Sequence, residues 1–314
     1  MELLGLHHVS ILTGKAEKNY DFFTNVLGMR LVKKTVNQDN PQSYHLFYAD
    51  AEGTPGTEVT YFDIPGLGRT YPGTTDISTV SLRVPTTESL HYWKQRFEEL
   101  EIDHDEMTNQ AGRNALAFRD YEGTRLMLVA DNGEKGVRAG VPWKREDIEE
   151  KHAIIGLGPV TLTVAEAKLT ADILTNVMGF RHVKSYNSMK VYATGEGGSG
   201  AEVHIVEEPG VPKARLGRGG VHHVAFRVPN EQEYGYWLER LKQARIPHSG
   251  EVERYYFKAI YFREPNGILF ELSTDTPGFA TDEPKETMGE KLALPPFLEP
   301  RRAEIEANLR PLDI

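Results

Sequence analysis

The chain has 314 residues, 39% of them apolar and 26% charged, with a formal net charge of −10. This balance is typical of a globular protein of about two domains, and the acidic charge argues against a nucleic-acid partner. Zero cysteines exclude disulfides and thiolate chemistry and favour a cytoplasmic location. Neither a membrane-spanning apolar stretch nor a secretory signal is predicted.

The first predicted elements are an alternating strand at 8–13 (HVSILT) and an amphipathic helix at 16–28 that ends at Gly28. Short strands follow, and the same order of one strand, one helix and three strands recurs three more times. The later units open with strands at 79–84, 159–164 and 223–228. Further short strands are predicted at 44–50, 58–64, 114–120, 124–130, 190–194, 202–208, 258–264 and 268–274. The clearest turn is Glu-Pro-Asn-Gly at 264–267.

Two internal repeats indicate that the four units alternate between two types. The stretch 21–34 (DFFTNVLGMRLVKK) matches 172–185 (DILTNVMGFRHVKS) at eight of fourteen positions. The stretch 79–93 (TVSLRVPTTESLHYW) likewise aligns with 223–237 (HVAFRVPNEQEYGYW). The chain is therefore expected to be an A-B-A-B array, with a period far longer than that of solenoid repeats.

The repeats divide the chain into two pairs of βαβββ modules. The first pair covers 1–135, as module one (about 1–65) and module two (about 75–135). A linker is predicted at 136–152. The second pair covers 153–276, as module three (about 153–208) and module four (about 218–276), and a C-terminal arm with one short helix occupies 277–314.

This plan, with a histidine in the first strand and a glutamate in the final strand after the Pro-Asn-Gly turn, resembles the vicinal oxygen chelate superfamily of glyoxalases, bleomycin resistance proteins and extradiol dioxygenases. The resemblance covers about residues 1–276. It implies an α+β fold in which βαβββ modules pair into two cupped, incomplete barrels, one of which holds a divalent metal. It also implies that the ligands come from two alignment columns, one in the first strand and one in the final strand of each module.

The two columns predict a single metal site. The first-strand column reads His8, Thr79, Pro159 and His223, and the final-strand column reads Thr60, Met127, His204 and Glu271. Modules two and three offer no set of ligands, whereas modules one and four offer His8, His223 and Glu271. Two imidazoles and a carboxylate are the facial triad of non-haem Fe(II) oxygenases. The alternative, that the two histidines are hydrogen-bonded core residues, is weakened by their equivalent places in the repeats.

The triad can form only if module one pairs with module four, which leaves modules two and three as a metal-free companion. Thr60 stands in the fourth ligand position, and it is a poor ligand. Three protein ligands leave open positions for a diol and O2, which favours an oxygenase over an isomerase.

The two histidine pairs, 7–8 and 222–223, raise the question of why imidazoles adjoin the ligands. Together with Ser10, Arg254 and Tyr261, they resemble the hydroquinone-type ring-cleaving dioxygenases, whose ligands also come from the first and fourth modules. The resemblance implies an Fe(II) enzyme, with Mn(II) as an alternative. It implies that Tyr261, His222 and Arg254 are catalytic and that His7 and Ser10 line the substrate pocket.

Plainer interpretations of these residues stay open: Tyr261 as a packing residue, Arg254 as a surface charge, and His7 and His222 as hydrogen-bonded residues at the rim. The remaining histidines fall outside both columns or, for His204, lack partners, and are interpreted as structural or surface residues: His45, His91, His104, His152, His182, His204 and His248.

The expected activity is opening of a hydroquinone ring, or a catechol ring, with both atoms of O2 entering the product, in degradation or detoxification of aromatic compounds. Two other functions stay open. A metal-dependent glyoxalase-type isomerase, lyase or thiol transferase would act without O2, and a small-molecule binding protein would show no turnover. The expected partners are a small aromatic diol and O2, with neither nucleic acid nor membrane, and the edge strands and the arm weakly favour a homo-oligomer.

Overall fold

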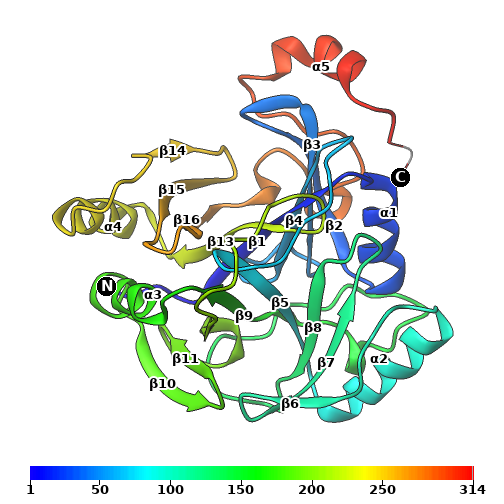
Figure 1. Ribbon diagram of the computed structural model, residues 1–314. Coiled ribbons are helices and arrows are strands. Elements are labelled where there is room, and N and C mark those ends of the chain that lie inside the picture. The colour runs from blue at the N-terminus through cyan, green and yellow to red at the C-terminus, as the bar shows by residue number, and fades with distance from the viewer. Residues whose placement is uncertain (313) are drawn as a thin grey trace.

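The computed structural model describes residues 1–312 and 314. Two curled sheets of eight strands each make up the molecule, with the longer helices on their outer sides (Figure 1). The predicted α+β fold of paired, cupped incomplete barrels is thereby confirmed. No helix among the described residues is long and apolar enough to cross a membrane.

Each predicted module contains one strand, one helix and three further strands. Module one comprises β1 (Leu6–Thr13), α1 (Ala16–Asp21), β2 (Arg30–Asn37), β3 (Asn40–Ala49) and β4 (Glu58–Asp63). Module two comprises β5 (Asp76–Val84), α2 (Thr87–Glu99), β6 (Thr108–Gln110), β7 (Arg113–Arg119) and β8 (Arg125–Ala130). Module three comprises β9 (Gly156–Val164), α3 (Ala167–Asp172), β10 (Arg181–Tyr186), β11 (Met189–Ala193) and β12 (Glu202–Glu207). Module four comprises β13 (Val221–Val228), α4 (Glu231–Gln243), β14 (Val252–Glu253), β15 (Phe257–Arg263) and β16 (Leu269–Pro277).

The helices differ between the two repeat types. In modules one and three the helix is short and continues into a π-helical turn, Phe22–Val26 and Ile173–Val177 respectively, so the helix predicted at 16–28 is α-helical only to Asp21. In modules two and four the helix has 13 residues. The side chains of Thr86 and Asn230 cap these helices by accepting a backbone N–H three residues on.

The strand order joins modules far apart in the sequence. One sheet runs β14-β15-β16-β13-β1-β4-β3-β2, so it combines modules four and one, and the other runs β10-β11-β12-β9-β5-β8-β7-β6. In each sheet the two first strands pair antiparallel at the centre, β1 with β13 and β5 with β9. Val9, Val80, Val160 and Val224 on these four strands are fully buried in one shared core. The alternate positions of the strands therefore face the concave side of each sheet.

The segment after β16 packs across β2 and β3 and ends in the short helix α5 (Arg302–Asn308), at the top of Figure 1. Its Phe279 and Met288 share a buried cluster with Val32 and Tyr256. The buried Lys33 ammonium lies 2.7 Å from a carboxylate oxygen of Asp282. This segment therefore braces the first sheet at the edge formed by β2.

Candidate active site

The three predicted ligands converge on the concave side of the first sheet, from the neighbouring strands β1, β13 and β16. Nε2 of His8 lies 3.2 Å from Nε2 of His223. Oε2 of Glu271 lies 3.3 Å from the first of these atoms and 2.8 Å from the second. All three side chains are buried. They meet in space although most of the chain separates His8 from His223 and Glu271. They form a group of the kind that holds a metal ion.

Strand register supports the alignment of the two columns. In module one, Ser10 pairs with Thr60 across parallel strands, and in module four Ala225 pairs with Glu271. In both modules, therefore, the residue in the final strand pairs with the residue two positions after the histidine of the first strand. Thr60 and Glu271 are consequently equivalent positions, and only the second carries a strong ligand.

The spacing of the three atoms fits a facial metal site. Ligand atoms bound at about 2.1 Å and at right angles lie about 3.0 Å apart, whereas tetrahedral angles would separate them by about 3.4 Å. Oε1 of Glu271 accepts a hydrogen bond from Ser273, 2.7 Å away, while Oε2 has no hydrogen-bond partner among the described residues. Burial opposes the charged carboxylate, but the adjacent His8 and His223 hold the pKa of Glu271 well below its usual value. A divalent cation held here would satisfy this charged, unpartnered oxygen.

The first histidine pair fixes which nitrogen of His8 is available. Nε2 of His7 lies 3.1 Å from the carbonyl of Thr274, which can only accept, so this nitrogen carries the hydrogen. Burial, followed by the charge of His8, lowers the pKa of His7 well below its usual value, so the ring is neutral and its Nδ1 accepts. The donor is Nδ1 of His8, 2.9 Å away. Nε2 of His8 is therefore left with a lone pair that faces Glu271.

The second pair repeats this arrangement. Nδ1 of His222 lies 2.8 Å from Nδ1 of His223. Burial, then the charge of His223, lowers the pKa of His222 to about 4, so this ring is also neutral near pH 7. With Nε2 of His223 directed at the ligand cluster, its Nδ1–H donates to His222, whose Nε2–H is left to face the cavity. The histidine pairs thus present two matched nitrogen lone pairs at one point.

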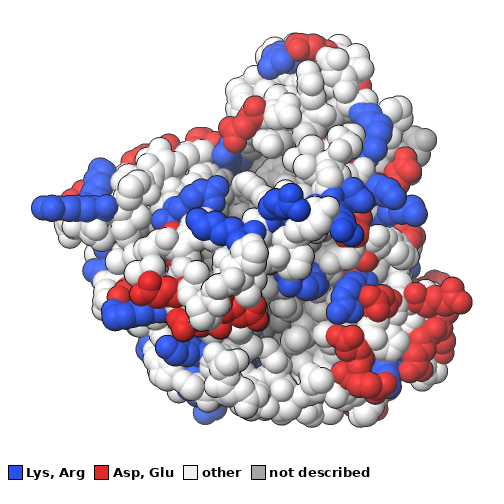
Figure 2. Space-filling view, viewed as in Figure 1, with Lys and Arg blue, Asp and Glu red and all other residues white. Residues whose placement is uncertain are grey.

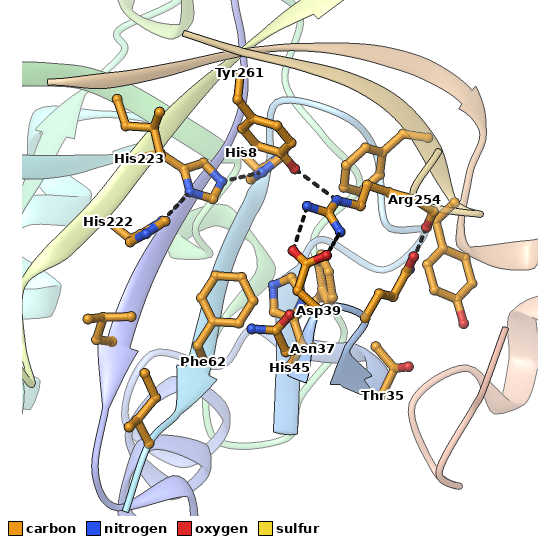
Figure 3. Close-up of a pocket in the computed structure, with 17 residues that line it drawn as sticks. His8, Thr35, Asn37, Asp39, His45, Phe62, His222, His223, Arg254 and Tyr261 are labelled. Atoms are coloured by element: carbon orange, nitrogen blue, oxygen red, sulfur yellow. Dashed lines mark hydrogen bonds and ion pairs between the residues drawn. The ribbon is translucent and has the colours of Figure 1, made fainter. Parts of the chain in front are cut away.

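A cavity of about 470 Å³ adjoins the cluster and is mostly apolar (Figure 3). The residues that line it are His8, Leu12, Thr35, Asn37, Gln38, Asp39, His45, Phe47, Phe62, Ile64, His222, His223, Arg254, Tyr256, Phe257, Tyr261 and Leu269. Its size and apolar walls suit a single aromatic ring.

Tyr261 and Arg254 meet at one side of this cavity, as Figure 3 shows. Nε–H of Arg254 donates to the Tyr261 hydroxyl at 3.2 Å, and the rings of Tyr261 and His223 lie 5.9 Å apart. The guanidinium also binds both carboxylate oxygens of Asp39, at 3.0 and 2.8 Å. Burial, then the charge of Glu271, raises the pKa of Tyr261. Tyr261 is therefore a protonated phenol that can donate a hydrogen bond into the cavity.

His7 and Ser10 lie behind the ligands instead of on the cavity wall. A register shift between Leu6 and Val9 breaks the alternation of β1, so His7 is buried and its ring lies 5.5 Å from that of Phe257. Oγ of Ser10 lies 2.7 Å from Oγ1 of Thr60. These two residues were expected to line the pocket, but neither is among the residues that line the cavity.

Sequence reasoning missed two parts of the cavity wall. His45 was interpreted as structural or surface, but it lies on β3 and lines the cavity. The last residue of β2 and the turn before β3 contribute Asn37, Gln38 and Asp39. Alternation along β3 from the buried Phe47 was the one available signal for His45, and nothing in the sequence links the turn to Arg254.

In the second sheet, an ion-pair network occupies the position equivalent to the ligand cluster. Arg113 binds both carboxylate oxygens of Glu202 at 2.8 Å, and Nε2 of His204 lies 2.9 Å from the same carboxylate. Among the described residues, clusters of three or more ligand-type side chains occur only around His8. The interpretation of His204 as a residue without ligand partners agrees with this arrangement.

Comparison with known proteins agrees with this geometry. The model of the Glyoxalase/Bleomycin resistance protein/Dioxygenase superfamily matches residues 5–128 and 156–272. The "Putative ring-cleaving dioxygenase MhqA" of Bacillus subtilis is 52% identical over 99% of this chain and 100% of its own. The crystal structure of a "putative dioxygenase" from Bacillus subtilis, 34% identical, superposes with a TM-score of 0.91 over 99% of this chain and 98% of its own. The "Chlorohydroquinone/hydroquinone 1,2-dioxygenase" of Sphingobium indicum is 29% identical over 96% of this chain and 94% of its own. The chain therefore belongs to the glyoxalase/bleomycin resistance protein/dioxygenase superfamily and, within it, to the ring-cleaving dioxygenases.

Proposed function

We propose that the protein is an Fe(II)-dependent dioxygenase that opens the ring of hydroquinones, or of catechols, with O2. The observation that carries this proposal is the facial cluster of His8, His223 and Glu271 at the base of an apolar cavity. The hydroquinone dioxygenase among the relatives supports the substrate class. We further propose a role in degradation or detoxification of aromatic compounds in the cytoplasm.

In this proposal His8, His223 and Glu271 hold the metal through Nε2, Nε2 and Oε2. Bound Fe(II) supplies open coordination positions for a substrate oxygen and O2 and a path for electrons between them. Mn(II) prefers similar nitrogen and oxygen donors and is the alternative. The apolar walls exclude water from the reacting groups.

The surrounding polar groups act on the substrate oxygens. The phenol of Tyr261 donates a hydrogen bond to oxygen at the open face, and Arg254 orients that phenol and places positive charge beside it. Nε2–H of His222 donates to a substrate oxygen, because its Nδ1 is engaged by His223. His7 and Ser10 act from behind the cluster: His7 orients His8, and Ser10 orients Thr60.

Oxygen uptake tests the proposal. Anaerobically iron-loaded protein is mixed with a panel of hydroquinones and catechols, and O2 consumption and product mass are followed. We expect stoichiometric O2 uptake with gain of two oxygen atoms in the product. Glu271→Ala should lose metal and activity together, whereas Glu202→Gln, at the equivalent network of the second sheet, should retain both. Absence of uptake across the panel, with metal bound, would favour a glyoxalase-type lyase or thiol transferase.

A further inference from the structure

His45 is held rigidly in the cavity wall. Its imidazole lies between the rings of Phe47 and Phe62, with centroids 4.0 Å from each. Nε2 lies 2.9 Å from Oγ1 of Thr60. Two aromatic contacts and one hydrogen bond therefore fix the direction in which the remaining nitrogen, Nδ1, points. That nitrogen has no hydrogen-bond partner among the described residues, and the ring is partly exposed at the cavity.

The hydrogen bonds behind His45 can reverse. Thr60 occupies the position equivalent to Glu271, but its hydroxyl is engaged by His45 and by Oγ of Ser10, at 2.9 and 2.7 Å. Because hydroxyl hydrogens rotate, the chain from Ser10 through Thr60 to His45 can run in either direction. Nδ1 of His45 can consequently present either a lone pair or a hydrogen to the cavity. Ser10 is fully buried, so this series of hydrogen bonds ends without reaching solvent. It can reverse its direction, but it transfers no net proton out of the cavity.

The surroundings of His45 keep its imidazole uncharged. Burial, followed by the charges of His8 and His223, lowers the pKa of His45 well below its usual value. The ring is therefore neutral near pH 7, and it can donate or accept one hydrogen bond at Nδ1 without adding a charge to the apolar cavity.

Two other polar groups of the cavity wall are engaged by neighbouring residues. The guanidinium of Arg254 is bound by Asp39 and Tyr261, and Oδ1 of Asn37 accepts from the backbone N–H of Asp39. In Figure 3 His45 lies below His8 and His223, across the cavity from Tyr261. A ring bound through one oxygen at the ligand cluster would thus extend toward the wall that contains His45.

We propose that Nδ1 of His45 binds the hydroxyl of a para-diol that points away from the metal ligands and so selects hydroquinones over catechols. This inference rests on the proposed function. The two oxygens of a catechol are adjacent and both reach the open side of the ligand cluster. Those of a hydroquinone lie at opposite ends of the ring, so the second one meets the wall formed by Phe47, Phe62 and His45. A hydroxyl buried there requires a polar partner.

Two substitutions at His45 separate this role from a structural one. The amide of Asn reaches about as far as Nδ1, and the longer Gln reaches the position of Nε2 beside Thr60. Metal-loaded protein is titrated anaerobically with hydroquinone and with catechol, and the dissociation constants are compared. We expect His45→Gln to weaken hydroquinone binding about 10-fold and catechol binding less than about 2-fold. His45→Asn should stay within about 3-fold of the wild type for both ligands.

Three results would overturn the inference: unchanged hydroquinone binding by His45→Gln, equal loss of both ligands, or equal losses in the two variants. Metal content and melting temperature are measured for each protein, and loss of binding that follows loss of metal also counts against it. The binding assay contains no O2. Selective binding of hydroquinone by a wild type that consumes no O2 would therefore refute the proposed function while leaving the role of His45 intact.

Discussion

Nδ1 of His7 lies 2.9 Å from Nδ1 of His8, and the equivalent atoms of His222 and His223 lie 2.8 Å apart. The first residue of each pair accepts a hydrogen from the second, which forces the lone pair of the second onto Nε2. Both pairs occur at equivalent places of β1 and β13, on either side of one antiparallel contact. Each ligand histidine therefore has its own orienting imidazole.

The first prediction follows from this relationship. Replacing His7 by Leu removes the acceptor for Nδ1–H of His8, so His8 is free to adopt the other tautomer or to rotate. We expect metal affinity to fall about 10- to 100-fold, measured by competition with a chelator. The control is His152→Leu, which removes a buried imidazole bonded to Ser89 of α2, away from the ligand cluster. If both variants lose metal to the same degree, His7 acts only through general packing.

The modular plan could be predicted from the sequence because two independent signals agreed. Alternation marked the strands, and the alignment of the repeats placed His8 in the same column as His223 and Thr60 in the same column as Glu271. Since parallel register between first and final strands is the same in both modules, the alignment carried directly into space. The ligand cluster follows from these columns together with the resemblance to the superfamily, without knowledge of any contact.

The rest depended on contacts that no local pattern encodes. A register shift in β1 turns His7 inward, although alternation predicts the opposite face or the rim. His45 lies outside both columns, so nothing in the alignment singled it out, while Asp39 meets Arg254 across 215 residues of chain. Such pairings arise from the arrangement of the modules, which sequence periodicity does not fix.

The second prediction concerns the ion pair of Asp39 and Arg254 at the cavity mouth. Asp39→Asn weakens the bidentate hold on a guanidinium that also binds Tyr261. We expect kcat/KM to fall about 3- to 10-fold, because a small displacement of a positioned group slows the reaction. Stability should change by less than about 1 kcal/mol, since the carboxylate is 72% exposed.

Arg254→Met should cost more, about 10- to 100-fold in kcat/KM. Lys258→Met is the matched control, because Lys258 forms a similarly exposed pair with Glu231 outside the cavity wall. Steady-state kinetics under saturating O2 distinguish the variants. Equal activity of Asp39→Asn and wild type would show that Arg254 keeps its position without the ion pair to Asp39.

The third prediction is a pH dependence of stability in the second sheet. Burial disfavours the charge on Glu202, but hydrogen bonds from His204 and Arg113 outweigh it and lower its pKa to about 2. Because the folded pKa lies below the unfolded value, this carboxylate stabilises the protein above about pH 4.5, and the stabilisation is lost as the pH falls toward about 2. At pH 7 it amounts to about 3 kcal/mol.

Glu202→Gln should therefore lower the free energy of unfolding at pH 7, and the difference from wild type should shrink steadily below pH 4.5. Urea unfolding at several pH values between 7 and 3 measures it. Glu106→Gln, at an exposed carboxylate paired with Lys94, serves as the control and should change the pH profile much less than Glu202→Gln, because solvent screens this pair. A constant difference between Glu202→Gln and wild type at every pH would contradict the charge-based explanation.

The fourth prediction concerns the contact of the C-terminal segment with the first sheet. The ammonium of Lys33 is fully buried and is bound by Asp282, at 2.7 Å, and by Glu283. Tyr256, which lines the cavity, donates to the other oxygen of Asp282 at 2.8 Å. Asp282 thus links the buried charge to the cavity wall. Replacing both acids, by Asp282→Asn with Glu283→Gln, leaves Lys33 without a counter-charge and should cost about 3–5 kcal/mol of stability.

Adding Lys33→Met to this double variant should restore part of the loss, because the buried charge is then removed instead of left unpaired. Either acid alone should cost much less than half of the double change, since the other carboxylate still lies beside the ammonium. Urea unfolding of the variants gives these coupling energies directly. If Lys33→Met destabilises the double variant further, the ammonium has found solvent or another partner, and the segment is held by its apolar contacts through Phe279 and Met288.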